Sequence, residues 1–152
     1  MPPGWTFNVH PASALTMTTL ADLIEEYGFL DADDRYRLLI DLGRALEAMP
    51  DALKTDATLV RGCSASVWVY PTLRSDGALH FLAYSNAAIT KGVIALVLLT
   101  VQDQQPAAIV ATDIDAALAP FDLRAQLSSN RTQGIPNMIA LIQETARRYH
   151  AD

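Results

Sequence analysis

Apolar positions in the first third of the chain follow a helical period. The first helix is predicted from four residues spaced at i, i+3, i+4 and i+7, namely Leu20, Leu23, Ile24 and Tyr27. Gly28 is expected to end it. Asp31 is placed to cap a second helix that Pro50 stops. The apolar stripe of this second helix would comprise Tyr36, Leu39, Ile40, Gly43 and Leu46.

After this helical region the pattern changes to strands. Three β-prone runs cover residues 58–60, 67–73 and 78–84. Asp76-Gly77 between the last two is a hairpin signal, because this pair accepts the positive φ of a tight turn. With these two residues as the turn, Tyr70 would face Ala83 and Trp68 would face Ser85. Pro71 cannot donate to a ladder, so its strand is expected to have a free side there.

The rest of the chain is predicted to be helical. Ser85 or Asn86 could cap a helix that runs to about Val101 and is apolar nearly all round, which predicts a buried central helix. Short helices are expected near residues 106–111 and 113–119. A last helix is expected to follow Gly134 or to begin somewhat before it, so Pro136 must lie in its first turn or kink it. Its inward positions would be Met138, Ile139, Ile142 and Ala146. The order predicts an α+β domain with a three-stranded antiparallel sheet against helices.

The net charge and its distribution along the chain limit the kinds of partner that we expect. The chain has 152 residues and a formal net charge of −6, and ten of its acidic residues lie between Met17 and Asp56 against four basic ones. These acids are expected to form a solvated helical surface or a docking surface for a basic partner. An acidic chain without a Lys or Arg run argues against nucleic acid.

Length and apolar runs also predict where the domain lies. Residues 17–152 suit a single domain, preceded by a flexible extension at 1–16. The most apolar run, residues 93–101, is too short to cross a membrane. The first residues carry no basic signal-peptide region. We therefore expect a soluble cytoplasmic protein without a membrane partner.

The chain has one cysteine, Cys63, which excludes an intrachain disulfide and a four-cysteine metal site. A free cysteine is most often a small buried hydrophobe. Gly62, Ser64 and Ser66, however, indicate a loop at a strand end, where reactive groups usually sit. The hairpin geometry would bring this cysteine to Ser85-Asn86 and the start of the central helix.

That environment favours a reactive sulfur. A helix N-terminus with Arg61 and Lys91 nearby would stabilise a thiolate. His80 would lie far along the strand, and His10 and His150 are terminal, so all three histidines are interpreted as structural. One activated cysteine without a base or a resolving thiol can still accept a group and pass it on, as in persulfide exchange.

Three segments of the sequence resemble the signature blocks of the SufE family. They are Arg61-Gly62-Cys63-x-x-x-Val67-Trp68, Ser85-x-Ala87-x-Ile89-x-Lys91-Gly92 and Leu127-Ser128-x-x-Arg131-x-x-Gly134-x-x-x-Met138. They occur in the order and spacing of the family, and the resemblance covers roughly residues 20–148. It departs from the family at Ala65, at Asn86 and at Ser129, where the usual residues are Ser, Asp and Pro.

The resemblance implies a SufE/NifU-like fold and a sulfur-acceptor function. Such proteins take persulfide sulfur from a SufS-type, pyridoxal-phosphate cysteine desulfurase and deliver it to a SufBCD-type scaffold for iron–sulfur cluster assembly. They act as accessories rather than as stand-alone enzymes. The pyridoxal phosphate belongs to the partner, so no cofactor is expected in this chain.

The resemblance also implies a set of site residues. Cys63 would accept the sulfur, and Arg131 would contribute to the partner contact near the thiol. The other candidate pocket and partner-contact residues are Arg61, Gly62, Ser64, Ser66, Trp68, Ser85, Asn86 and Lys91. Alternatives left open are a CsdE-like acceptor for another desulfurase, an interaction module with a structural cysteine, and a peroxide-sensing single-cysteine protein.

Overall fold

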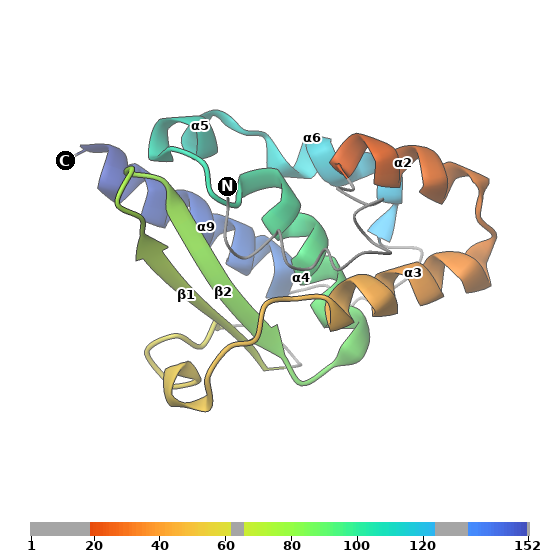
Figure 1. The fold of residues 1–152 in the computed structure, drawn as a ribbon, viewed down its shortest axis with the longest axis horizontal. Coiled ribbons are helices and arrows are strands. Elements are labelled where there is room, and N and C mark those ends of the chain that lie inside the picture. Colours follow the sequence, from red (N-terminus) through yellow and green to blue (C-terminus); the bar gives the residue numbers. More distant parts are fainter. Residues whose placement is uncertain (1–18, 62–65, 124–133, 152) are drawn as a thin grey trace.

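The computed structural model describes residues 19–61, 66–123 and 134–151. Figure 1 shows the hairpin of β1 and β2 crossing α9, with α4 beside them and α2 and α3 away from the hairpin turn. The predicted α+β class is therefore confirmed. In chain order the elements are α2 (Leu20–Phe29), α3 (Ala32–Arg44), η2 (Asp51–Leu53), β1 (Val67–Leu73), β2 (Leu79–Ser85), α4 (Ala88–Val101), α5 (Pro106–Ala111), α6 (Ile114–Leu118), η3 (Ala119–Phe121) and α9 (Gly134–Ala151).

Each of the first two helices begins directly after an N-cap residue whose side chain accepts a hydrogen bond from the first turn. Thr19 and Asp22 form a capping box at the start of α2. The Asp31 carboxylate accepts a hydrogen bond from the Asp34 N–H at 2.9 Å, which confirms Asp31 as the N-cap of α3. Their predicted ends were wrong. Gly28 lies inside α2, which runs to Phe29, and α3 ends at Arg44, well before Pro50.

The predicted apolar stripe of α3 needs one correction. Leu39 and Gly43 are buried, as expected, while Ile40 and Leu46 are half-buried. Tyr36 is 45% exposed and does not belong to the stripe.

The hairpin has the predicted strands and a register shifted by one residue. Trp68 pairs with Tyr84 and Tyr70 with Leu82. The Arg74 N–H donates to the Ala78 carbonyl at 2.8 Å, so three residues form the turn instead of two. Gly77 takes the left-handed conformation there, with φ of +89°, as a three-residue hairpin connection requires.

The sheet has two strands among the described residues, so the predicted third strand is wrong. The run at residues 58–60 forms only an isolated bridge, from Leu59 to Trp68. Its hydrogen bonds join Val60 to Val67 at 2.8 Å and Thr58 to Val69 at 2.9 Å. They stop short of Pro71, which has no N–H to continue the pairing. The prediction of a free side at that proline is consistent with this pattern.

The far edge of β2 is covered by the residues that follow α4. The Gln102 side-chain amide donates to the Phe81 carbonyl at 2.8 Å and accepts from the Phe81 N–H at 2.7 Å. Leu79 exchanges backbone hydrogen bonds with Asp103 and Gln104. A glutamine side chain and a short backbone segment thus take the place of a neighbouring strand along this part of the edge.

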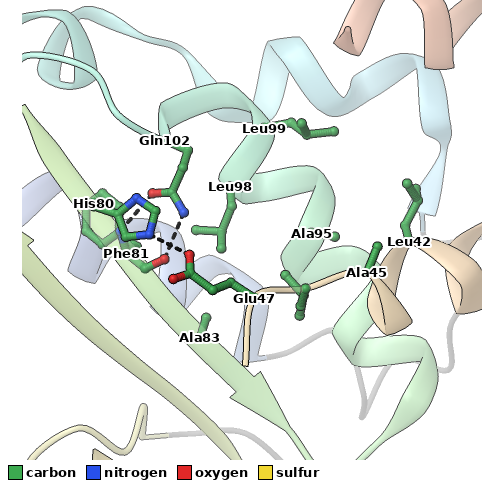
Figure 2. Close-up of a pocket in the computed structure, with 11 residues that line it drawn as sticks. Leu42, Ala45, Glu47, His80, Phe81, Ala83, Ala95, Leu98, Leu99 and Gln102 are labelled. Carbon is green, nitrogen blue, oxygen red and sulfur yellow. Dashed lines mark hydrogen bonds and ion pairs between the residues drawn. The ribbon is translucent and has the colours of Figure 1, made fainter. Parts of the chain in front are cut away.

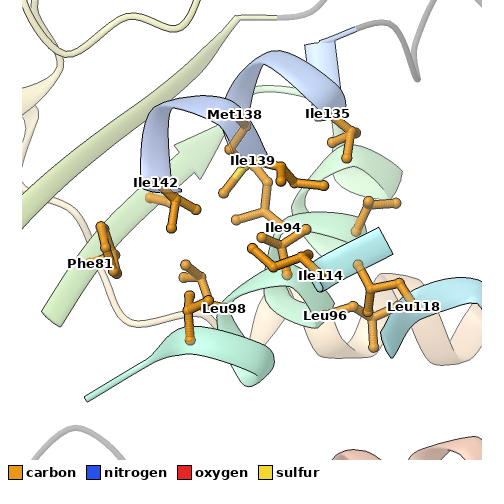
Figure 3. Close-up of a cluster of buried hydrophobic side chains, with 14 of the residues drawn as sticks. Phe81, Ile94, Leu96, Leu98, Ile114, Leu118, Ile135, Met138, Ile139 and Ile142 are labelled. Atoms are coloured by element: carbon orange, nitrogen blue, oxygen red, sulfur yellow. The ribbon is translucent and has the colours of Figure 1, made fainter. Parts of the chain in front are cut away.

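The core forms around α4, which is buried on nearly all sides as predicted. Figure 3 shows side chains of α4, α6, α9 and β2 pointing into one shared cluster. The inward residues predicted for the last helix are confirmed as buried, namely Met138, Ile139, Ile142 and Ala146. Pro136 lies in the first turn of α9, where its missing N–H costs no helical hydrogen bond. No helix among the described residues has the length and apolar character to cross a membrane.

Helices α3 and α4 approach each other at two glycines. A Cβ placed on Gly92 would lie 2.1 Å from the Leu39 carbonyl oxygen, and one on Gly43 would lie 2.8 Å from the Lys91 Cβ. The backbone of Leu39 cannot move away without shifting α3. Glycine is therefore required at position 92 by the closeness of the two helices.

We predict that Gly92→Ala lowers the free energy of unfolding by about 3 kcal/mol or more, because the new methyl group overlaps backbone atoms of α3. The matched control is Gly28→Ala, where nothing lies within 4 Å of the added Cβ. Because Ala favours a helix more than Gly does, the control should gain about 0.5–1 kcal/mol. Chemical denaturation of both variants checks this, and equal effects would contradict the close packing.

Candidate functional site

The described residues nearest Cys63 in the chain are Arg61 and Ser66. Cys63 itself lies outside the described residues, as do Gly62, Ser64 and Arg131 of the predicted site and the extension at 1–16. The Val60 N–H donates to the Val67 carbonyl at 2.8 Å, which ties together the chain on either side of residues 61–66. The Arg61 carbonyl accepts a hydrogen bond from the Asn137 amide of α9, also at 2.8 Å. The described residues on either side of Cys63 are therefore held at the sheet and at α9, and we call these flanks, Val60-Arg61 and Ser66-Val67, the anchored segment.

The anchored segment lies at the end of the hairpin where Val67 pairs with Ser85. Ser85 is fully buried, and its hydroxyl accepts a hydrogen bond from the Ala87 N–H at 3.2 Å. Asn86 is exposed. The N-cap of α4 is Ala87, without a side-chain cap bond, so the prediction of Ser85 or Asn86 as the cap was wrong. The serine turn delays the start of the helix, because its hydroxyl bonds the backbone two residues on.

An aromatic pair with two lysines lies on the outward face of this hairpin end. The rings of Trp68 and Tyr84 are 6.1 Å apart and tilted by 33°. The Lys54 ammonium lies 3.8 Å from the centre of the Tyr84 ring, and that of Lys91 lies 4.9 Å from it. Both distances are within the range of a cation–π interaction. We call these four residues the Tyr84 cluster.

Sequence reasoning found half of this cluster. Trp68 and Lys91 were predicted site residues, and the structure brings them to one place. Lys54 and Tyr84 were missed. The predicted register set Ser85 opposite Trp68, and the observed register brings Tyr84 there instead. The period-two alternation of buried and half-buried positions along β2 puts Tyr84 on the outward face and could have indicated it, while no sequence signal links Lys54 to it.

Two of the three basic residues near the anchored segment have no acidic partner. Among the described residues, neither Arg61 nor Lys91 forms an ion pair. Lys54 binds the Asp51 carboxylate at 2.9 Å, and the Lys54 side chain is only 20% exposed. The positive charge available at this end of the hairpin therefore comes mainly from Arg61 and Lys91.

The first turn of α4 contains a buried hydroxyl without a partner. Thr90 is 2% exposed, and its Oγ1 has no hydrogen-bond partner among the described residues. Thr100 lies on the same helix and donates its hydroxyl to the Val97 carbonyl at 2.6 Å. Burial of a hydroxyl without a hydrogen bond is unfavourable. Thr90 therefore destabilises the fold at the end of the helix that faces the candidate site.

A cavity of about 110 Å³ lies elsewhere, between α3, β2 and α4. His80 of β2 is one of its lining residues, and Figure 2 shows it beside Glu47. The imidazole nitrogens of His80 lie 2.7 Å from carboxylate oxygens of Asp103 and Glu47. With both nitrogens engaged, His80 offers neither a base nor a metal ligand to the cavity. This supports the structural role predicted for it.

Two further observations concern metals and the other histidines. His150 is exposed on α9, and His10 lies outside the described residues. Within the described part of the chain, no three His, Cys, Asp or Glu side chains come together in a group that could hold a metal ion.

Comparisons with known proteins agree on one family. The model of the SufE family, described as an Fe-S metabolism associated domain, matches residues 21–146. The sulfur acceptor protein CsdE of Escherichia coli (strain K12) is 39% identical over 103 residues, which are 68% of this chain and 70% of that protein. An uncharacterized SufE-like protein of Rhizobium meliloti (strain 1021) is 34% identical over 134 residues, covering 86% of this chain and 96% of the relative.

A solved structure shares the fold. The solution structure of a hypothetical protein from Thermus thermophilus superposes with a TM-score of 0.70 at 15% sequence identity. The match covers 88% of this chain and 96% of that one. At this identity the likeness concerns the fold alone.

We predict that Thr90→Val raises the free energy of unfolding by up to about 1 kcal/mol, because it removes a buried hydroxyl without a partner and keeps the shape of the side chain. Thr100→Val is the matched control and should lower it by about 1 kcal/mol, because it removes a hydrogen bond. Urea denaturation of both variants measures the difference. A loss of stability in Thr90→Val equal to that of the control would show that the Thr90 hydroxyl is bonded.

Proposed function

Because the chain belongs to the SufE family, we propose that it is a sulfur acceptor that takes persulfide sulfur from a cysteine desulfurase onto Cys63 and delivers it for iron–sulfur cluster assembly. The observation that carries this proposal is the family match, which extends from α2 into α9 and includes all three motifs. The relative whose printed name is a sulfur acceptor supports the same chemistry.

The proposed reaction is a thiol–persulfide exchange. The Cys63 thiolate attacks the outer sulfur of the partner's cysteine persulfide. A sulfur–sulfur bond forms at Cys63, the corresponding bond in the partner breaks, and the partner's cysteine leaves as a thiolate. One sulfur atom moves and one thiolate replaces another, so no oxidant or reductant is consumed. Transfer onward to an acceptor thiolate repeats the exchange and regenerates Cys63.

The geometry around the described flanks supports this assignment. Cys63 is two positions along the chain from Arg61, whose carbonyl accepts a hydrogen bond from Asn137 and whose side chain is exposed. Positive charge stabilises a thiolate and increases its fraction at neutral pH. Lys91 in the first turn of α4 adds to this field. We assign Arg61 and Lys91 to this electrostatic role.

The remaining predicted residues complete the proposed site. Ser85 shapes the turn beside the segment through its bond to Ala87, and Trp68 supplies an aromatic surface. We assign partner contact to Asn86, Ser66 and Arg131. Gly62 and Ser64 are the chain neighbours of the cysteine, and we assign them to the surface that enters the partner's active site with it.

Two partner systems are compatible with this function. The first is a SufS-type desulfurase with delivery to a SufBCD-type scaffold. The second is a CsdE-like acceptor with its own desulfurase, which the 39% identical relative favours. The chemistry at Cys63 is the same in both, and the two differ in the enzyme that the chain binds.

We predict that the protein increases sulfide release from cysteine by its cognate desulfurase several-fold, and that Cys63→Ser abolishes the increase. A serine hydroxyl cannot form the persulfide. The assay is run with both types of desulfurase, and circular dichroism confirms that the serine variant is folded. Full stimulation by Cys63→Ser would refute persulfide transfer through this residue.

A further inference from the structure

We infer that the Tyr84 cluster, Lys54, Trp68, Tyr84 and Lys91, is a recognition surface for an acidic segment of the desulfurase that the proposed function requires. The ligand class is carboxylate side chains of a protein partner. This inference rests on the proposed function and adds to it the chemistry of the partner surface. It also assigns a role to Lys54 and Tyr84, which the motifs of the family do not include.

The first argument is the convergence of two cations on one ring. Lys54 follows η2, and Lys91 belongs to α4, yet both ammonium groups lie against Tyr84, at 3.8 and 4.9 Å from the ring centre. Two positive charges beside one ring make this a locally cationic site, to which a carboxylate is attracted.

The second argument is that the charge of Lys91 has no internal partner. Lys91 has no ion pair among the described residues. Lys54 pairs with Asp51 at 2.9 Å. Arg37 and Arg44 of α3 likewise pair with an acid, at 3.2 Å and 3.7 Å. Lys91 is therefore the main anchor of the Tyr84 cluster for an external carboxylate, and Lys54 contributes when Asp51 is displaced.

The third argument is the charge of the rest of the chain. The net charge is −6, and the acids concentrate in the first two helices. An acidic partner is repelled by that surface and attracted to the Tyr84 cluster, so the electric field of the molecule favours one orientation of approach. That orientation presents the anchored segment, whose residues flank Cys63 in the chain, to the partner. The same net charge disfavours a polyanion such as a nucleic acid.

The fourth argument is the aromatic content. Trp68 and Tyr84 form a half-buried pair, and both lysines lie against the Tyr84 ring. Aromatic side chains beside basic ones are typical of the energetic centre of a protein interface, because they exclude water from the charged contacts. The surface therefore combines charge for orientation with apolar area for affinity.

The test compares two variants that each remove two positive charges. Lys54→Gln/Lys91→Gln changes the Tyr84 cluster, and Arg37→Gln/Arg44→Gln changes α3. We expect the first to weaken binding to the intact desulfurase by about tenfold and to reduce the salt dependence of the dissociation constant. The second should bind as the wild type does. The charge-conserving Lys54→Arg/Lys91→Arg should restore binding.

A further variant is expected to strengthen binding to the desulfurase. Asp51→Asn removes the carboxylate that competes for Lys54, and we expect it to tighten binding about twofold. Isothermal titration calorimetry at low and high salt gives all of these constants. A single-stranded oligonucleotide serves as the polyanion control, and binding of it as tightly as the desulfurase would overturn the assignment to a protein partner.

The outcome separates this inference from the proposed function. If the wild type stimulates sulfide release but Lys54→Gln/Lys91→Gln binds with unchanged affinity and salt dependence, the recognition surface is wrong and the sulfur acceptor stands. If the wild type binds the desulfurase through the lysines but Cys63 never acquires sulfur, the proposed function is wrong and the recognition surface stands.

Discussion

The contact between α3 and α4 at Gly92 is the constraint on which the arrangement of the site depends. The Leu39 carbonyl oxygen occupies the space that a Cβ at this position would need. This contact sets the position of α4 against α3. Lys91 is the residue before Gly92, so its position is set with it. The Lys91 side chain passes Gly43 and ends beside the Tyr84 ring. Helix packing in the core thus determines where a surface cation lies.

The hairpin and the last helix supply the second part of the site. Val60 and Val67 close the segment that contains Cys63, and Asn137 of α9 holds its first residue. Gln102 covers part of the other edge of β2, so that edge is not left to pair with another strand. The site therefore depends on elements from both halves of the chain, which explains why its motifs are dispersed along the sequence.

Features that depend on residues close together in the chain were predicted correctly from the sequence. The cap at Asp31 and the period of α9 depend on residues a few positions apart, and both agree with the structure. The register was wrong by one residue because the turn has three residues, which Asp76-Gly77 alone does not reveal. Ser85 was mistaken for a helix cap because its hydroxyl can bond the backbone in a turn as well.

Other features depend on tertiary contacts that no local pattern encodes. The run at residues 58–60 has strand propensity but only one bridge to β1, because pairing ends before Pro71. Lys54 reaches Tyr84 through the path of the chain between α3 and β1. Cys63 is the candidate by its neighbours and its motif, and its role stays a prediction that chemistry must test.

The measurement that tests the central claim most directly is mass spectrometry of the intact protein after incubation with the desulfurase and cysteine. Alkylation and peptide mapping then locate any added sulfur. The account predicts a gain of one sulfur atom on Cys63, lost on treatment with a thiol reductant. An unmodified Cys63 beside an active desulfurase that binds the protein would contradict it.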